Sequence, residues 1–335
     1  MAGISRLIVH GTLAAAALAL AAPAAAQQTS AEPAAVQVGA SGESFLREPD
    51  YRIGKIVYRL GLAGRAHCPV PFPLTGALFH HLAEYRPADR PEAIRRYGLD
   101  SGPGILAVLP DSPAAAAGLR AGDALLTVNG IRFPAPAAVG AEDQSRGWRR
   151  TVEAPEMLLE EQLRQGPARL EVLREGRTIP LTLGSTPGCP ARGRLARSNQ
   201  ANAFADGRYA IMTTRFLGFF QDDNELAVAM AHELAHNILD HPDYLEAQGV
   251  PYNILRHIGR NARLVRATEI EADRLSVRLL AAAGYDLNAI VPFWRRLYGR
   301  FDSQLQIISA HPSLRARLRV IEEELSAVRA QPLRG

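Results

Sequence analysis

Two histidines four positions apart flank a glutamate in a strongly apolar stretch, residues 225–241 (ELAVAMAHELAHNILDH). The spacing of its apolar residues predicts a largely buried helix. On that helix His232 and His236 lie one turn apart on the same face, so both imidazoles can bind a single zinc ion. Glu233 follows the first histidine and can serve as general base for a water molecule whose pKa zinc lowers towards about 7. Because the pattern is only suggestive alone, a third ligand must be found.

A second amphipathic stretch supplies the candidate third ligand. Residues 266–285 (RATEIEADRLSVRLLAAAGY) predict a helix that ends at Gly284. Glu269 and Asp273 are four apart and share a face, whereas Glu271 points elsewhere and is expected to be a surface charge. Glu269 can complete a His-His-Glu site that leaves one position open for water. Asp273 can accept the free ring N–H of a zinc histidine and fix its tautomer. The alternative, two ordinary helix-surface acids, is disfavoured by the buried histidine pair.

The remaining histidines are weaker candidates for metal ligands. His241 lies five residues beyond His236, about 140° around a helix, and is expected to face the helix end. The remaining ones are expected to be solvated or packed: His67, His80, His81 and His257.

Together these motifs resemble a known group of enzymes. HELAH, the run EIEAD about 33 residues later and the following AGYD resemble the HtpX-like and CAAX-prenyl-protease-like zinc metallopeptidases, and within them the soluble periplasmic type that enhances β-barrel assembly. The resemblance covers about residues 200–320. It implies one zinc ion per chain, bound by His232, His236 and Glu269, with Glu233 as the base. It also implies an α+β fold class with a mainly helical zincin (gluzincin) peptidase domain.

Two flanking motifs extend this resemblance. Asn202-Ala203-Phe204, followed by YAIMT at 209–213, is similar to the family's edge strand, which pairs with substrate backbone in related enzymes. His311-Pro-Ser with Arg317 is similar to the family's C-terminal HPSxxxR. The resemblance implies that Arg317 stabilises the reaction's oxyanion or orders the site. It implies His311 as a fourth zinc ligand that can take the water position and make the enzyme latent; a purely structural His-Pro turn is the alternative.

Residues 104–133 have a different character. A buried-strand pattern begins at Gly104, and Ser112 and Pro113 predict the start of a short helix. The run SPAAAAGLRAGDALLTVNG resembles bacterial PDZ domains, which implies a small β-rich domain with a groove where a peptide ligand adds as an extra strand. The segment 102–105 (GPGI) stands where a carboxylate-binding loop could be, although its proline departs from the pattern. A PDZ domain that only spaces or docks is the alternative.

The domain order follows from these motifs. Residues 45–66 and about 75–97 predict helices, so residues 45–94 are expected to form an N-terminal helical segment that packs on the peptidase domain. The PDZ domain is expected at 95–187 and the zinc metallopeptidase domain at 188–335. Cys68 and Cys189 stand just before and just after the PDZ region, so we predict a disulfide that ties the two ends of this insertion together.

The N-terminus has the features of an export signal. Arg6, the apolar run 7–20 and the small residues 24–26 predict a cleavable signal peptide over 1–26, followed by a flexible linker over 27–44. An uncleaved membrane anchor is the alternative. Export predicts a periplasmic location, where a disulfide persists. No later stretch has 18 uncharged apolar residues, so no transmembrane span is expected in the mature chain.

Composition narrows the function classes. The 335 residues allow two or so domains, and two cysteines cannot build a Cys-rich zinc module. The formal net charge is +4, but the 38 basic residues, of which only Lys55 is lysine, are scattered among 34 acids. No nucleic-acid partner is therefore expected.

These observations predict an exported zinc-dependent endopeptidase. Its expected partners are extended or misfolded envelope proteins, bound with the help of the PDZ domain in protein quality control. One alternative is a latent peptidase that acts mainly as a PDZ adaptor or chaperone, although the intact Glu233 argues against a dead enzyme. Another is a zinc hydrolase with a non-peptide substrate, which the two peptide-binding features disfavour.

Overall fold

The computed structural model describes residues 48–85, 87–134, 147–251, 254–305 and 312–330. The predicted signal peptide (1–26), the predicted linker (27–44) and His311 lie outside these residues and stay predictions. None of the described helices is long and apolar enough to cross a membrane.

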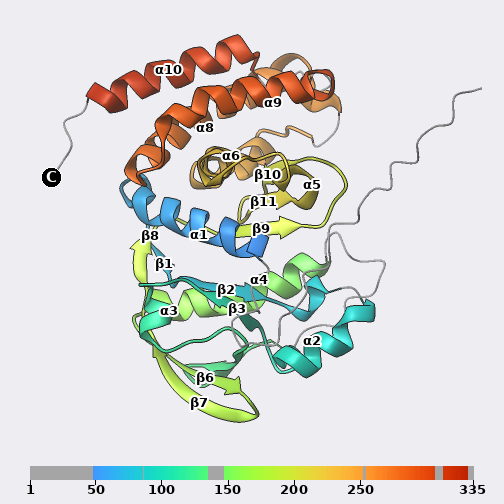
Figure 1. Ribbon diagram of the computed structural model, residues 1–335, viewed down its shortest axis with the longest axis vertical. Coiled ribbons are helices and arrows are strands. Elements are labelled where there is room, and N and C mark those ends of the chain that lie inside the picture. Colours follow the sequence, from blue (N-terminus) through green and yellow to red (C-terminus); the bar gives the residue numbers. More distant parts are fainter. Residues whose placement is uncertain (1–47, 86, 135–146, 252–253, 306–311, 331–335) are drawn as a thin grey trace, which may run out of the picture. The chain divides into compact units, whose positions relative to one another are not determined.

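Helix α6 (Asp223–Ile238) runs through the larger hydrophobic core. It begins where the side chain of Asp222 accepts a hydrogen bond from the backbone N–H of Glu225, 3.0 Å away. Eleven of the 16 residues of α6 are buried, which confirms the largely buried helix expected around the two histidines. Helix α6 packs against α1 (Glu48–Ala63) and α8 (Gly259–Ala282), as Figure 1 shows.

A small sheet lies against α6. Its strand order is β10-β11-β9, in which β11 (Ala210–Thr213) pairs antiparallel with β10 (Ala203–Ala205) and parallel with β9 (Gly193–Ala196). β10 is therefore an edge strand of the described sheet, and it packs directly on α6. The edge strand expected around Phe204 is thus present.

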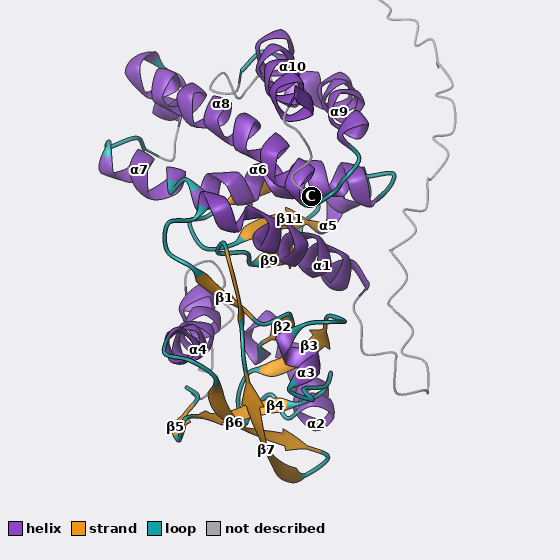
Figure 2. Ribbon diagram, turned by 90° about the vertical axis from the view of Figure 1, so that its left-hand side faces the viewer, coloured by secondary structure: helices purple, strands orange, loops and turns teal. Residues whose placement is uncertain are grey.

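Further helices complete this part of the chain. α10 packs against both α8 and α9, as Figure 2 shows from the side, and its apolar side chains belong to the same hydrophobic core as those of α6. The bounds are α5 (Thr214–Leu217), α7 (His241–Ala247), α9 (Ile290–Leu305) and α10 (Leu314–Ala330).

A second sheet carries the PDZ-like sequence and has its own core, which includes Ile105, Leu125 and Leu170. Its strands run antiparallel in the order β2-β3-β4-β6-β7, with β5 paired to β4. The predicted cap is present, since Ser112 Oγ accepts from the backbone N–H of Ala115. The bounds are β2 (Ala77–His80), β3 (Gly104–Val108), β4 (Ala124–Val128), β5 (Ile131–Arg132), β6 (Ala168–Arg174), β7 (Arg177–Leu183), α2 (Arg90–Tyr97), α3 (Pro113–Ala116) and α4 (Gly147–Arg164).

The helix expected over 75–97 is wrong in its first half. Ala77–His80 form β2, which pairs with β3, and only Arg90–Tyr97 are α-helical. A short apolar run such as Ala-Leu-Phe fits a buried strand as well as a helix, and pairing with a neighbouring strand decides between them. The sheet therefore begins before residue 95. Of the N-terminal segment expected to be helical, α1 packs against α6, α8 and β9.

The carboxylate-binding loop expected at 102–105 is not beside a free strand edge. The carbonyl of Pro103 accepts a hydrogen bond from the backbone N–H of Leu125, and Gly104 begins β3, an inner strand.

A disulfide and a pair of short strands join the two ends of the PDZ-like region, and we call them the neck (residues 68–74 and 186–189). The disulfide expected between Cys68 and Cys189 is present, with Cα atoms 5.5 Å apart and a sequence separation of 121. Beside it β1 (Phe72–Leu74) pairs antiparallel with β8 (Thr186–Gly188). The segments that lead into and out of the second sheet are therefore held side by side.

We expect the Cys68→Ser/Cys189→Ser double variant to be less stable than the parent chain. Closing a loop of this length contributes up to roughly 5 kcal/mol in the chain-entropy model. Denaturant unfolding of the oxidised parent, the reduced parent and the variant measures the loss, and the last two are expected to coincide. Two titratable thiols in unreduced, denatured protein would contradict the disulfide itself.

Candidate metal centre

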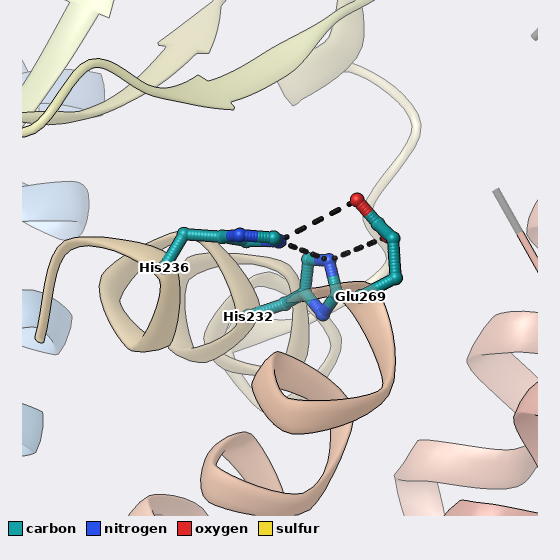
Figure 3. Close-up of side chains that lie close together, drawn as sticks. All are labelled: His232, His236 and Glu269. Carbon is teal, nitrogen blue, oxygen red and sulfur yellow. Dashed lines mark hydrogen bonds and ion pairs between the residues drawn. The ribbon is translucent and has the colours of Figure 1, made fainter. Parts of the chain in front are cut away.

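Three potential metal ligands converge between α6 and α8. His232 and His236 project from α6 and Glu269 from α8, and one ligand atom of each lies within 4.8 Å of the others (Figure 3). The two Nε2 atoms are 3.2 Å apart. Glu269 places Oε2 3.4 Å from His232 Nε2 and Oε1 3.6 Å from His236 Nε2. The structure thus brings together the three residues that the sequence selected as ligands.

Two features of the helices bring the three ligands together: the spacing of the histidines along α6 and the small side chains beside the ligands. The four-residue separation puts both imidazoles on one face of α6. Ala231 and Ala235 on α6 and Ala272 on α8 are fully buried next to the site residues. Small side chains at a helix–helix contact reduce the distance between the axes, so a glutamate on one helix can reach histidines on the other.

Asp273 lies directly behind the first histidine. Its Oδ1 lies 3.1 Å from His232 Nδ1, and its side chain is fully buried. A carboxylate can only accept, so this contact favours the proton on Nδ1 and leaves the Nε2 lone pair of His232 for a metal. The position that the sequence assigned to Asp273 is therefore the one it occupies.

His241 and Glu271 form a comparable chain behind the second histidine, which the sequence analysis did not foresee. His241 Nδ1 lies 2.9 Å from His236 Nδ1, and its Nε2 lies 3.1 Å from Glu271 Oε2. Glu271 accepts from Nε2–H, so the neutral ring of His241 offers its Nδ1 lone pair to the Nδ1–H of His236. His236 then also presents the Nε2 lone pair to the site. Burial lowers the pKa of His241, although Glu271 opposes the shift, and this favours the neutral ring.

The expectation that His241 faces the helix end is wrong because α6 does not continue to it. Asp240 adopts a left-handed backbone conformation (φ 52°), and His241 begins the separate helix α7. An angle counted along one continuous helix therefore does not apply. Pro242, at the start of α7, is the sequence signal that marks this break. Glu271 is exposed, as expected, but it also holds His241.

Arg317 of α10 binds the two acids of α8. Its Nη2 donates to Glu269 Oε2 at 2.6 Å, and its Nε lies 3.1 Å from Asp273 Oδ2. The guanidinium also stacks over the ring of Trp294, 4.0 Å from the centroid. Its side chain is 3% exposed. Of the two roles expected for Arg317, this geometry fits ordering of the site.

The electrostatics of the site favour a cation. Burial alone would lower the pKa of His232, but Asp273 and Glu269 outweigh it and raise that pKa to about 10. Burial would also lower the pKa of Arg317, yet the same two carboxylates raise it. Two imidazole nitrogens and one carboxylate oxygen are a donor set that zinc prefers in catalytic sites. The residues present therefore fit a zinc ion.

The remaining expected residues lie on α6 and at the edge strand β10. Glu233 is half-buried on α6, one position after the first ligand. Asn202 precedes the edge strand β10 and its backbone N–H donates to Thr213 Oγ1, while Phe204 on β10 is 38% exposed. The roles of these residues, of Ala203 and of Arg317 in catalysis stay predictions, as does that of His311, which lies outside the described residues.

Comparisons with known proteins agree with this arrangement. Residues 187–259 and 250–325 match peptidase family M48, and residues 104–135 match the PDZ domain family. The mitochondrial metalloendopeptidase OMA1 of Schizosaccharomyces pombe is 28% identical over 153 residues, 39% of this chain and 45% of that protein. The chain thus spans less than half the length of this curated relative.

Two solved structures each align with about a third of the chain. The HtrA3 PDZ domain bound to a phage-derived ligand (FGRWV) has 20% identity, a TM-score of 0.25 and coverage of 35% of this chain and 89% of that one. The HtrA-type protease AlgW with decapeptide has 24% identity, a TM-score of 0.24 and coverage of 36% and 31%.

Removal of the outer histidine is expected to weaken metal binding. In His241→Ala and in Glu271→Gln, His236 loses the hydrogen-bonded groups that fix its tautomer. Zinc affinity should therefore fall about 10- to 100-fold. Competition with a chromophoric chelator measures it. The matched control is Glu246→Gln, an exposed acid on α7, which should leave the affinity unchanged. Equal zinc affinities in all three variants would show that the contacts of His236 with His241 and Glu271 do not contribute to metal binding.

Loss of Arg317 is expected to destabilise the fold. Arg317→Met leaves Glu269 and Asp273 buried without their cation, at a cost of about 3–5 kcal/mol. Urea unfolding of the metal-free protein measures this, with Arg319→Met as control because the Arg319 side chain is 76% exposed on the same helix. Similar losses in the two variants would argue against a central role for the buried arginine.

Proposed function

Because the chain carries a peptidase family M48 domain and a PDZ domain, we propose that it is a zinc-dependent endopeptidase. One observation carries the proposal: the two histidines of the HELAH motif and Glu269 place ligand atoms within 4.8 Å of one another. The named relative, a metalloendopeptidase, supports the same reaction class.

Each residue of the site has a different role in the proposed reaction. A zinc ion held by His232, His236 and Glu269 would supply Lewis acidity and a water molecule with a lowered pKa. Asp273 and His241 keep the two imidazoles in the tautomer that binds metal. Glu233 takes the proton of the attacking water and delivers it to the nitrogen of the leaving amine. Arg317 holds Glu269 in place and balances the charge of the two acids.

The substrate is an extended polypeptide. Strand β10 has a paired neighbour on one side only in the described sheet, and it packs on the helix that carries both histidines. A substrate segment that adds to this edge would be held by main-chain hydrogen bonds next to the metal, and Phe204 would contact its side chains. Unfolded or unassembled proteins offer such segments, so quality control is the proposed role, with the PDZ domain assisting substrate binding.

We propose further that the mature protein is periplasmic. The export signal expected over 1–26 supports this, and the disulfide between Cys68 and Cys189 is compatible with an oxidising compartment. A latent peptidase that serves mainly as a PDZ adaptor is the second candidate, because the proposed His311 ligand would take the position of the water.

Casein cleavage by mature protein separates these candidates. Glu233→Gln should retain zinc and lose about 10²- to 10⁴-fold of the cleavage rate, since it removes the general base. Glu246→Gln should cleave like the parent. Parent protein that binds zinc but does not cleave casein, even with His311 replaced by alanine, would favour the adaptor.

A further inference from the structure

The edge strand β2 and the helix α4 enclose a groove in the PDZ domain. β2 ends the order β2-β3-β4-β6-β7 and has one partner strand in the described sheet. A pocket is lined by β2, by one face of α4, by residues 72–76, by three residues of α1 and by residues 191–194. In PDZ domains a ligand adds as a strand to a sheet edge of this kind. The groove is therefore where a peptide would bind, and a segment of the same chain borders it.

Arg194 of β9 occupies this groove. Its Nη1 donates to the backbone carbonyl of Phe79 on β2, 2.8 Å away. Its Nη2 pairs with Glu156 on α4, and Glu84 lies 3.7 Å from Nη1. The guanidinium thus bridges strand and helix, and it uses a backbone acceptor that an added strand would use. The side chain of Arg194 is 13% exposed.

The wall formed by α4 is acidic. Glu156 is buried, and although burial raises its pKa, Arg194, His81 and Arg208 outweigh that effect and lower the pKa below its usual value. One turn further along α4, Glu160 receives a bidentate pair of hydrogen bonds from Arg192, both 2.7 Å. This wall therefore selects for guanidinium groups.

The internal arginine does not satisfy all its own hydrogen-bonding groups. The Nε–H of Arg194 is buried and has no hydrogen-bond partner among the described residues. A buried donor that lacks an acceptor destabilises the arrangement that buries it. A peptide that brought its own backbone and an arginine could replace Arg194 and leave the carboxylate of Glu156 paired.

We propose that the groove between β2 and α4 binds an extended peptide that carries an arginine, and that Arg194 fills this site as an internal competitor. The peptide would pair with β2, take the carbonyl of Phe79 as an acceptor and place its guanidinium on Glu156. Peptides with an acidic residue at that point would be rejected, because they would bring a second negative charge against a buried one. This inference rests on the PDZ domain and not on the proposed peptidase activity.

Replacement of Arg194 by a peptide arginine would affect the candidate metal centre through the small sheet β10-β11-β9. Arg194 stands opposite Ile211 in the parallel pairing of β9 with β11, and β11 pairs in turn with the edge strand β10. Tyr209, which leads into β11, donates its hydroxyl to Glu156 Oε2 at 2.8 Å. Release of Arg194 is therefore expected to loosen residues 203–213.

Binding is measured by fluorescence anisotropy with a labelled nonapeptide of alternating threonine and valine that has a central arginine. The comparison peptide has a central glutamate. All proteins carry Glu233→Gln in the full mature chain, so that peptides are not cleaved and binding is read independently of any peptidase activity. Arg194→Ala should bind the arginine peptide about ten-fold or more tightly than the parent, since the groove is no longer filled. Arg197→Ala, an exposed neighbour, should bind like the parent.

Thermal unfolding reports whether Arg194→Ala folds, and if it does not, a measurement on the parent keeps the proposal testable. In the parent, saturating arginine peptide should increase amide hydrogen exchange over 203–213, and glutamate peptide should not. In Arg194→Ala with Glu156→Gln the preference for the arginine peptide should disappear. Equal binding of the two peptides by folded Arg194→Ala, or no tighter binding than by the parent, would overturn the proposal. So would unchanged exchange in the parent at saturation.

Discussion

The structure of the candidate metal centre depends on one buried arginine. Arg317 reaches from α10 to two carboxylates of α8, Glu269 and Asp273, in a layer where all three side chains are nearly inaccessible to solvent. Removing charges from water is costly, and only mutual pairing at short distance offsets the cost. The pairing therefore fixes where α10 lies against α8, and the same contact aims Glu269 at the histidines of α6. Fold stability and ligand geometry are thus set by one set of contacts.

Different residues lie behind the two imidazoles, but both arrangements leave the Nε2 atom facing the centre. Asp273 acts on His232 directly, from the helix that also supplies Glu269. His236 is more exposed, with 12% of its side chain accessible, and is held through His241 from the start of α7. In both cases an acceptor behind Nδ1 leaves Nε2 facing the centre. The end of α6 is therefore part of the site, because the chain must break at Asp240 to bring His241 back.

What the sequence could predict was local in character. His232, His236, Glu269 and Asp273 were identifiable because a four-residue spacing on a helix places side chains on one face whatever the rest of the chain does. Other features depend on partners distant in sequence. β2 became a strand through its pairing with β3, and Arg194 and Glu156, on different elements, meet only in the folded chain. The disulfide was predictable because both cysteines flank a recognisable insertion.

The contact between the PDZ-like part and the part that holds the metal-ligand residues is built from charges, and this limits how the two parts can move. Glu156 and Glu160 of α4 are paired with Arg194, Arg192 and Arg208, and most of these groups are largely buried. If the two parts separated and no other group took the place of the arginines, these ion pairs would be lost. The rehydration of the exposed charges would offset only part of that loss. The neck at Cys68 and Cys189 restricts the same motion covalently. If the groove between β2 and α4 binds a peptide as proposed, that peptide must displace Arg194. Peptide binding and the arrangement of β9, β11 and β10 would then be thermodynamically linked.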